Sequence, residues 1–340
     1  MTRRERIAAT LQNRTPDRIP RTYAAVPGFC HNHPGALEHI EKRFPQDTGD
    51  CGYRLPDGAV RGDPYAVGTY VDEWGCAFEN VHPGVIGQVK HPIIQSYSDL
   101  ACYKPPFHLI GQGMENVDRT CDAADGFTSS AVPLQPFERM QFLRGTQSLL
   151  LDLIEQPAGW FKLRDMVHEF NLACLDSWCR TAIDCVVLAD DWGSQRSLLI
   201  SPDLWRELFK PLYADYIAGA RGAGKFTYMH SDGYITDILD DLIEIGLDAV
   251  NAQVTCMDMA ELARRFAGRI TFWGQMDRQH MLCFQEPADA RQAARDFQKH
   301  LAAPNGSRTV AQMYIEPTAK PENIEAVLDE FERLELPASP

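Results

Sequence analysis

The chain has 340 residues, of which 44% are hydrophobic and 24% are charged, and its formal net charge is −14 at pH 7. This composition is typical of a folded globular protein and excludes a disordered chain or a small disulfide scaffold. The acidic excess, without a stripe of lysine and arginine residues, argues against nucleic acid as a partner.

The N-terminal segment and the cysteines indicate a cytoplasmic protein. No apolar segment follows the basic residues at 1–7, and no run of 18 or more apolar residues occurs, so we expect neither a signal peptide nor a membrane-spanning helix. Ten cysteines lie scattered between Cys30 and Cys283, without the spacing of a disulfide framework or a zinc cage. We therefore expect a soluble protein with reduced thiols.

The first part of the chain shows one clear helix and then little periodicity. Thr2 and Glu5 have the spacing of a capping box, and the apolar residues after them predict a short helix that ends before Pro16. From Tyr23 to about residue 126 the chain is rich in glycine, proline, histidine and aromatic residues. This stretch predicts irregular excursions and short strands.

In the second part of the chain, apolar runs alternate with amphipathic stretches. The apolar runs predict strands at 184–190, 226–230, 248–251, 270–274 and 309–313. The amphipathic stretches predict helices at 141–154, 160–179, 202–221, 234–245, 259–266, 287–301 and 321–334. This alternation implies βαβ units and a parallel sheet, for which a closed barrel and a doubly wound sheet both fit.

Polar or aromatic residues stand at the carboxyl ends of four successive predicted strands, where a barrel places its active site. No glycine-rich phosphate-binding loop follows any strand. We therefore predict an α/β fold, a (β/α)8 TIM barrel with an irregular N-terminal extension. We expect one domain over residues 1–340, with the excursions and first barrel units in 1–135 and regular βα units in 136–340.

The strongest candidate site is His230 with Asp232, at the end of one predicted strand and just before a helix. A histidine and a carboxylate two residues apart on a sharp turn can bind a metal, relay a proton or bind a polar ligand. The segment can equally be a helix cap, with Ser231 or Asp232 at the N-cap and Gly233 in the turn.

A second candidate site is formed by Asp190 and Asp191 with Trp192, which follow another strand. The two carboxylates can hold a cation or act as a base beside an apolar wall that shifts their pKa, or they can belong to a solvated loop. Glu138 and Arg139 either close over the site or pair on a helix surface. Further candidates for substrate contact are Gln195, Asn251, Gln253, Trp273, Asp72, Trp74 and Tyr23.

The order of several short motifs resembles that of the uroporphyrinogen decarboxylase superfamily. The motifs lie at 4–7, 15–20, 72–76, 87–92, 137–139, 190–193, 200–205, 230–233 and 321–324. This resemblance covers nearly the whole chain and implies a (β/α)8 barrel with its cleft at the carboxyl ends of the strands.

Within that superfamily, the chain resembles the corrinoid-linked methyltransferase branch rather than the haem-pathway decarboxylase. The decarboxylase carries an arginine-rich signature of the form Met-Arg-Gln-Ala-Gly-Arg, whereas residues 21–28 here read RTYAAVPG. An acidic protein without that pair of arginines binds a polyanionic tetrapyrrole poorly, because each buried carboxylate needs a charged partner.

The methyltransferase branch implies a zinc site made of a His-x-Cys motif and a later cysteine. His230 occupies the histidine position and Asp232 replaces the first cysteine, while the second cysteine position falls near Met313. Asp232 and Glu316 can still bind zinc through oxygen. The expected metal ligands are therefore His230, Asp232 and Glu316.

Three functions follow from this resemblance. The first is methyl transfer from a small substrate, such as an aryl methyl ether or a methylamine, to or from a corrinoid on a partner protein. In this hypothesis His230, Asp232 and Asp190 are catalytic, and Trp192 and Trp273 form pocket walls. The second function is decarboxylation of a tetrapyrrole or another carboxylated substrate. The third is a barrel that binds a ligand or a corrinoid protein without catalysis.

Overall fold

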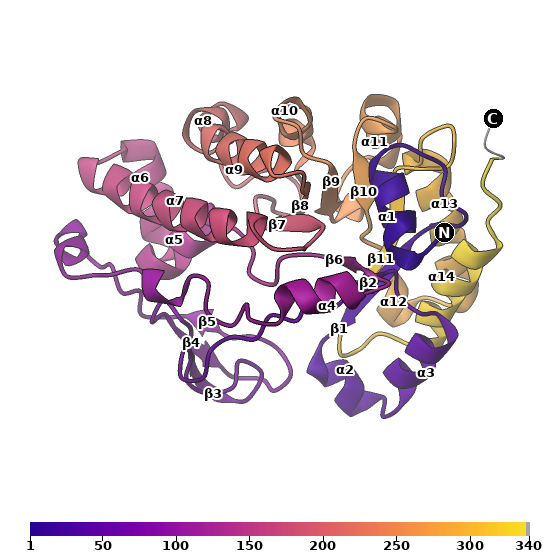
Figure 1. Ribbon diagram of the computed structural model, residues 1–340, viewed down its shortest axis with the longest axis horizontal. Coiled ribbons are helices and arrows are strands. Elements are labelled where there is room, and N and C mark those ends of the chain that lie inside the picture. The colour runs from indigo at the N-terminus through magenta and orange to yellow at the C-terminus, as the bar shows by residue number, and fades with distance from the viewer. Residues whose placement is uncertain (338–340) are drawn as a thin grey trace.

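Six parallel strands form a sheet that curls, with helices covering its outer face (Figure 1). The computed structural model describes residues 1–337. The strand order is β1-β11-β10-β9-β8-β7, and all neighbouring strands are parallel. These strands are β1 (Arg21–Ala25), β7 (Cys185–Ala189), β8 (Phe226–Ser231), β9 (Ala249–Ala252), β10 (Thr271–Trp273) and β11 (Thr309–Ile315).

Two short strands lie between the ends of this sheet. They are β2 (Thr48–Gly49) and β6 (Phe127–Thr128), which pair in parallel. On one side the Asp47 N–H donates to the Arg21 carbonyl at 2.9 Å, and on the other the Ser130 N–H donates to the Cys185 carbonyl at 2.9 Å. The curled parallel sheet is consistent with a TIM-like barrel.

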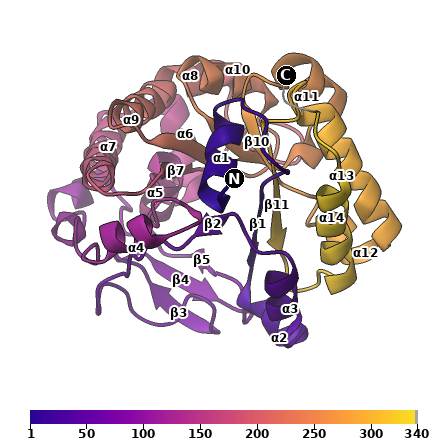
Figure 2. The ribbon, with the colours of Figure 1, turned by 45° about the vertical axis from the view of Figure 1, so that its right-hand side comes forward.

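Helices surround the sheet, and one helix lies across its amino-terminal end (Figure 2). That helix is α1 (Arg3–Leu11), whose Ile7 and Leu11 pack against Trp273 and Val310 inside the curl. No helix among residues 1–337 is long and apolar enough to cross a membrane. The surrounding helices are α7 (Ala158–Cys179), α8 (Pro202–Leu208), α9 (Lys210–Gly222), α10 (Leu239–Glu244), α11 (Met259–Phe266), α12 (Met281–Phe284), α13 (Pro287–Leu301) and α14 (Pro321–Arg333).

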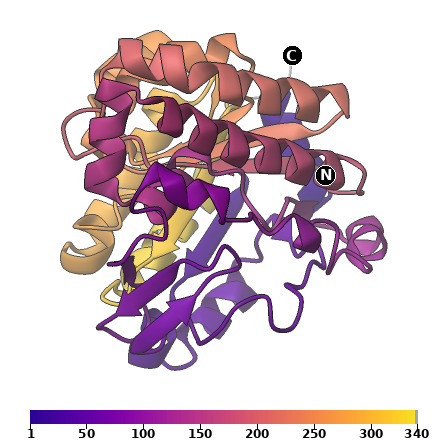
Figure 3. The same cartoon turned by 90° about the vertical axis from the view of Figure 1, so that its left-hand side faces the viewer.

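The region between β1 and α7, which includes the predicted irregular stretch up to about residue 126, contains a small antiparallel sheet and short helices. The sheet consists of β3 (Gly68–Val71), β4 (Ala77–Asn80) and β5 (Gln88–Val89). Its strands, drawn in purple, lie at the edge of the molecule below α7 (Figure 3). The helices are α2 (Pro27–Asn32), α3 (Ala36–Arg43), α4 (Val117–Ala123), α5 (Pro136–Arg144) and α6 (Thr146–Glu155).

The strands predicted from apolar runs are confirmed as β7 to β11, and the capping box of Thr2 and Glu5 is present at the start of α1. Two predicted helices are each divided in the structure. The stretch 141–154 is split at Gly145, whose φ of 83° ends α5. The stretch 202–221 is split after Leu208, because Pro211 has no N–H to continue the hydrogen bonds of α8 into α9.

A buried carboxylate connects α1 with the strands around it. The Asp47 side chain is fully buried, accepts from Arg6 Nη1 at 2.5 Å and from Arg18 Nη1 at 2.8 Å, and also accepts from the Arg21 N–H at 2.8 Å. Each carboxylate oxygen is therefore paired, which offsets the cost of burying its charge.

We predict that Asp47→Asn destabilises the protein by about 3 kcal/mol, because it removes the buried carboxylate that buried Arg6 and half-buried Arg18 share. Urea unfolding followed by circular dichroism measures this loss. As a control, Asp176→Asn breaks the exposed pair with Arg180 on α7 and should leave the unfolding midpoint nearly unchanged. Equal effects of the two substitutions would contradict the assignment of Asp47 as a structural anchor.

Candidate functional site

Three candidate ligands meet at the carboxyl ends of β7 and β8. Asp191 lies just beyond β7, while His230 is the last residue of β8 that pairs with β7, and Asp232 follows β8 directly. His230 Nε2 is 3.5 Å from Asp191 Oδ1 and 3.6 Å from Asp232 Oδ1. One ligand atom from each of the three residues lies within 4.8 Å of the others, and we call this group the Asp191–His230–Asp232 cluster.

The orientation of the His230 ring is set by Asn251 on β9. His230 Nδ1 is 2.6 Å from Asn251 Oδ1, and the Asn251 amide nitrogen donates to the Trp273 carbonyl at 2.5 Å and to Gln312 Oε1 at 3.1 Å. Because both of these partners are acceptors, they identify the amide nitrogen of Asn251 as the atom that faces them. The amide oxygen therefore faces the His230 ring and accepts from Nδ1–H. His230 Nε2 is therefore the ring nitrogen that faces the two carboxylates.

The two oxygens of Asp232 have different environments. Oδ2 accepts from Arg278 Nη2, whereas Oδ1 is buried and has no hydrogen-bond partner among residues 1–337. Arg278 Nη1 lies 3.6 Å from Glu316 Oε1, so Arg278 stands between Asp232 and Glu316. Asp191, not Glu316, is the third residue that lies beside His230 and Asp232, and the expected metal ligand set stays a prediction.

The loops after β7 and β8 pack backbone against backbone. A Cβ atom on Gly193 would lie 2.3 Å from the Tyr234 nitrogen, and Gly233 has a φ of 78°. The Gly193 N–H donates to the Asp232 carbonyl at 3.1 Å, and Ser231 Oγ accepts from the Trp192 N–H at 3.0 Å. His230 and Ser231 thus end β8, and Asp232 and Gly233 begin the loop after it; the segment is not a helix cap, since the next helical residues begin at Thr236.

Asp190 faces away from the cluster. Its fully buried carboxylate accepts from the Glu138 N–H at 2.7 Å, the Phe137 N–H at 3.1 Å and the Tyr213 hydroxyl at 2.5 Å. Burial raises the pKa of Asp190 to about 7. The Asp190 side chain therefore anchors the first turn of α5, and its catalytic role stays a prediction.

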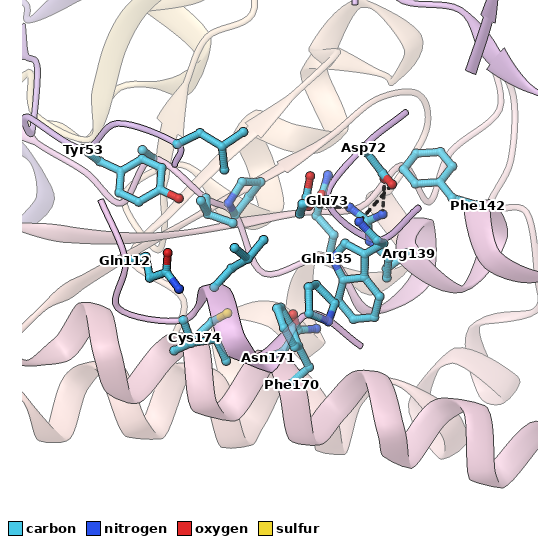
Figure 4. Close-up of a pocket in the computed structure, with 18 of the residues that line it drawn as sticks. Tyr53, Asp72, Glu73, Gln112, Gln135, Arg139, Phe142, Phe170, Asn171 and Cys174 are labelled. Carbon is cyan, nitrogen blue, oxygen red and sulfur yellow. Dashed lines mark hydrogen bonds and ion pairs between the residues drawn. The ribbon is translucent and has the colours of Figure 1, made fainter. Parts of the chain in front are cut away.

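A cavity of about 640 Å³ lies between α5, α7 and the β3–β4–β5 sheet (Figure 4). Its charged lining residues are Asp72, Glu73, Glu138 and Arg139. Its aromatic lining residues are Tyr53, Tyr70, Trp74, Phe78, Phe142, Phe170 and Trp178. Pockets that are mostly apolar and carry a few placed polar groups are typical of small-molecule sites.

Arg139 joins the two sides of the cavity. Its buried guanidinium donates to Asp72 Oδ2 at 2.5 Å and lies 3.4 Å from Glu73 Oε1. It also lies 4.8 Å from the centroid of the Trp74 ring. Arg139 therefore pairs across the cavity, and not with Glu138 on a helix surface.

Glu138 connects the cavity to the cluster. Its Oε2 accepts from Gln135 Nε2 at 3.0 Å, and both side chains line the cavity. Burial, followed by the negative charges of Asp191 and Asp190, raises the pKa of Glu138 to about 9. Glu138 is therefore a neutral carboxyl group at pH 7 and can donate a hydrogen bond into the cavity.

Several of the predicted substrate-contacting residues lie in or near these two regions. Asp72 and Trp74 line the cavity. Gln253 is buried beside the cluster, where its Oε1 accepts from the Gly233 N–H at 2.9 Å. Gln195 lies in an open depression beyond the cluster, together with Arg278 and Glu316.

Three predicted aromatic contacts are corrected by the structure. Trp192 is fully buried and stacks on Phe137 at a centroid distance of 4.1 Å. Trp273 is buried inside the curled sheet, where its Nε1 donates to Thr22 Oγ1 at 3.1 Å. The hydroxyl of Tyr23 donates to the backbone carbonyl of Phe44, shortly before β2, and the Tyr23 side chain does not line the cavity. All three side chains are parts of the core.

Other site residues were not predicted from the sequence. Arg278 directly follows the aromatic and acidic segment 273–277. This position is the signal in the sequence from which Arg278 could have been predicted as a site residue. The cavity-lining residues of α7, which include Phe170, Asn171 and Cys174, recur at helical spacing, as a core-facing stripe also does.

Comparisons with known proteins agree with this architecture. The family model described as uroporphyrinogen decarboxylase (URO-D) matches residues 67–334. Among solved structures, a methyltransferase from Methanosarcina mazei is similar over 98% of each chain, with a TM-score of 0.64 and 16% sequence identity. At this identity the likeness shows a common fold. No curated protein matches the chain.

We predict that Glu138→Gln makes the protein more stable than the wild type at pH 8, by on the order of 2–4 kcal/mol. Since folding raises the pKa of Glu138 from 4.5 to about 9, the folded state binds more protons in this window, and wild-type stability falls as pH rises. The gain should vanish below about pH 4.5, where both states are protonated.

Urea unfolding of both proteins at pH 4.5, 6 and 8 measures this difference. Glu155→Gln, at the exposed end of α6, is the matched control and should give no pH-dependent gain. Parallel stability profiles for wild type and Glu138→Gln would contradict a buried, neutral Glu138.

Proposed function

The chain belongs to the uroporphyrinogen decarboxylase family, and we propose that it is an enzyme that transfers a methyl group from a small methylated substrate to a corrinoid on a partner protein. The reacting groups in this proposal are those of the Asp191–His230–Asp232 cluster. The cavity beside the cluster is the proposed substrate site, because Glu138 lines it and is affected by the charge of Asp191.

The observation that carries this proposal is the buried, unpartnered Oδ1 of Asp232 beside His230 Nε2. A buried carboxylate oxygen without a partner is costly, so its retention indicates a cation or a proton at this position. Asp191 Oδ1 lies on the other side of the same nitrogen. This arrangement supports a site for an electrophile at the carboxyl ends of β7 and β8.

The donor set of the cluster fits zinc through one nitrogen and two carboxylate oxygens. Asp191, His230 and Asp232 would hold the ion, and Asn251 would fix the His230 ring from behind. Zinc at this position would supply Lewis-acid polarisation of the atom that carries the methyl group. Since no thiolate is present in the cluster, the proposal concerns an oxygen or nitrogen atom, not activation of a thiol.

The charges of the cavity argue against a polycarboxylated tetrapyrrole as the substrate. Among the described residues, Arg139 is the one cationic side chain that lines the cavity, and it is already paired with Asp72 and Glu73. A substrate with several carboxylates needs several unpaired cationic partners. This observation favours methyl transfer over decarboxylation of such a substrate.

An open depression lies beside the cluster. This depression is formed by residues that include Gln195, Arg278 and Glu316, and it reaches solvent beside Asp232. The likeness in fold to a methyltransferase supports the reaction class, while the identity of the methyl acceptor is our proposal.

We further propose that the eight parallel strands close into a complete (β/α)8 barrel. The backbone hydrogen bond from Asp47 to Arg21 supports contact of β2 with β1, and those from Ser130 to Cys185 and from Leu134 to Val187 support contact of the β6 segment with β7. In a closed barrel the ends of β7 and β8 face the central mouth, as the proposed site requires.

We expect His230→Ala to lower methyl transfer by at least about 100-fold while the far-ultraviolet circular dichroism stays unchanged, because the substitution removes the central group of the cluster. Spectroscopic corrinoid methylation over a panel of methyl ethers and methylamines measures this effect. His39→Ala, at an exposed histidine on α3, is the matched control. Full activity of His230→Ala would contradict the assignment of the site.

We also expect the purified protein to retain about one zinc ion per chain, and Asp191→Asn and His230→Ala to lose it, since each removes one of three ligands. Inductively coupled plasma mass spectrometry measures the metal content. Asp203→Asn, at an exposed carboxylate on α8, should retain the zinc of the wild type. Equal zinc content in all four proteins would place the ion elsewhere.

A further inference from the structure

The cavity has an excess of negative charge that its own residues do not neutralise. Three carboxyl groups, those of Asp72, Glu73 and Glu138, line it with the single guanidinium of Arg139. Even with Glu138 neutral, two carboxylates remain for one cation. An anionic ligand would therefore be repelled, and a ligand with one positive charge would balance the cavity.

The Arg139 cation is already paired with two carboxylates of the cavity. Its Nη1 donates to Asp72 Oδ2 at 2.5 Å, and its Nη2 lies 3.4 Å from Glu73 Oε1. The plane of the guanidinium is covered by Trp74 and Phe142, with centroid distances of 4.8 and 5.5 Å. Two of the aromatic rings that line the cavity, those of Trp74 and Phe142, thus already make cation–π contacts with Arg139.

Further aromatic rings line the rest of the cavity. Phe170 contacts the Trp74 ring edge-on at a centroid distance of 4.4 Å, and Tyr53 lies 5.4 Å from Trp178. Figure 4 shows Glu73 on the side of the cavity opposite α7, which carries Phe170 and Cys174. A carboxylate facing aromatic walls is the environment that stabilises a quaternary ammonium group, which has no N–H to donate.

We propose that this cavity binds a methylated ammonium compound, which serves as the methyl donor of the reaction proposed above. This inference rests on the proposed function and names its substrate class. In the transfer step the C–N bond breaks and its electron pair stays on nitrogen, which becomes a neutral amine. The methyl acceptor, a reduced corrinoid, supplies the electron pair of the new bond to carbon.

Choline and 3,3-dimethylbutan-1-ol test this inference, because they have nearly the same shape and differ by one positive charge. We expect the full-length protein to bind choline at least about tenfold more tightly, as expected from cation–π attraction and one facing carboxylate. Isothermal titration calorimetry at pH 7.5 measures both affinities. Equal affinities, tighter binding of the neutral alcohol or no binding of choline would overturn the inference.

Two substitutions locate the binding. Glu73→Gln removes one facing charge, and Phe170→Leu removes one aromatic wall, so each should weaken choline binding at least about threefold and leave the neutral alcohol unaffected. Glu155→Gln on α6 is the control for a charge lost far from the cavity. Unchanged choline binding in both cavity variants would place the ligand outside the cavity and overturn the inference.

These outcomes are separate from those of the proposed function. A preference for choline together with no methyl transfer from any substrate would reject the reaction and retain the cationic ligand class. Methyl transfer from an ether without a preference for choline would reject the inference and retain the reaction.

Discussion

The buried carboxylate of Asp190 holds the cavity and the cluster in one place. It accepts from two N–H groups in the first turn of α5 and from the hydroxyl of Tyr213 on α9. Because Asp190 directly follows β7, this anchor turns Asp191 towards His230 and at the same time directs Glu138 into the cavity. Three donors offset part of the cost of burial, which nevertheless raises the pKa of Asp190 to about 7.

Two carboxylates, the buried one of Asp47 and the half-buried one of Asp232, differ in how their oxygens are paired. Asp47 is surrounded by donors from Arg6, Arg18 and the backbone, so both of its oxygens are paired. Asp232 has one oxygen bonded to Arg278 and one buried oxygen without a partner among residues 1–337. Folding alone favours full pairing, and an unpaired buried oxygen therefore marks the position at which a ligand contributes.

Sequence alone predicts the cluster better than the cavity, for a physical reason. The carboxyl ends of parallel strands meet at one edge, so residues at predicted strand ends, such as His230 and Asn251, are expected to lie together. The cavity is built from segments without periodicity and from one face of α7, where Phe170 has the spacing of a core residue. Trp192 failed as a pocket wall because its position at a strand end does not reveal which way the ring points.

The position of the third ligand decides which side of the cluster a bound ion would face. The later cysteine position falls near Met313, which is fully buried, while its neighbour Gln312 contacts Asn251. Side chains alternate along a strand, so Met313 points to the opposite face of β11 from Gln312. Glu316 lies next to Arg278, on the side of the open depression. The charge of Asp191 raises the pKa of Glu138, so a metal held by Asp191 would lie on the side of the cluster that faces Glu138.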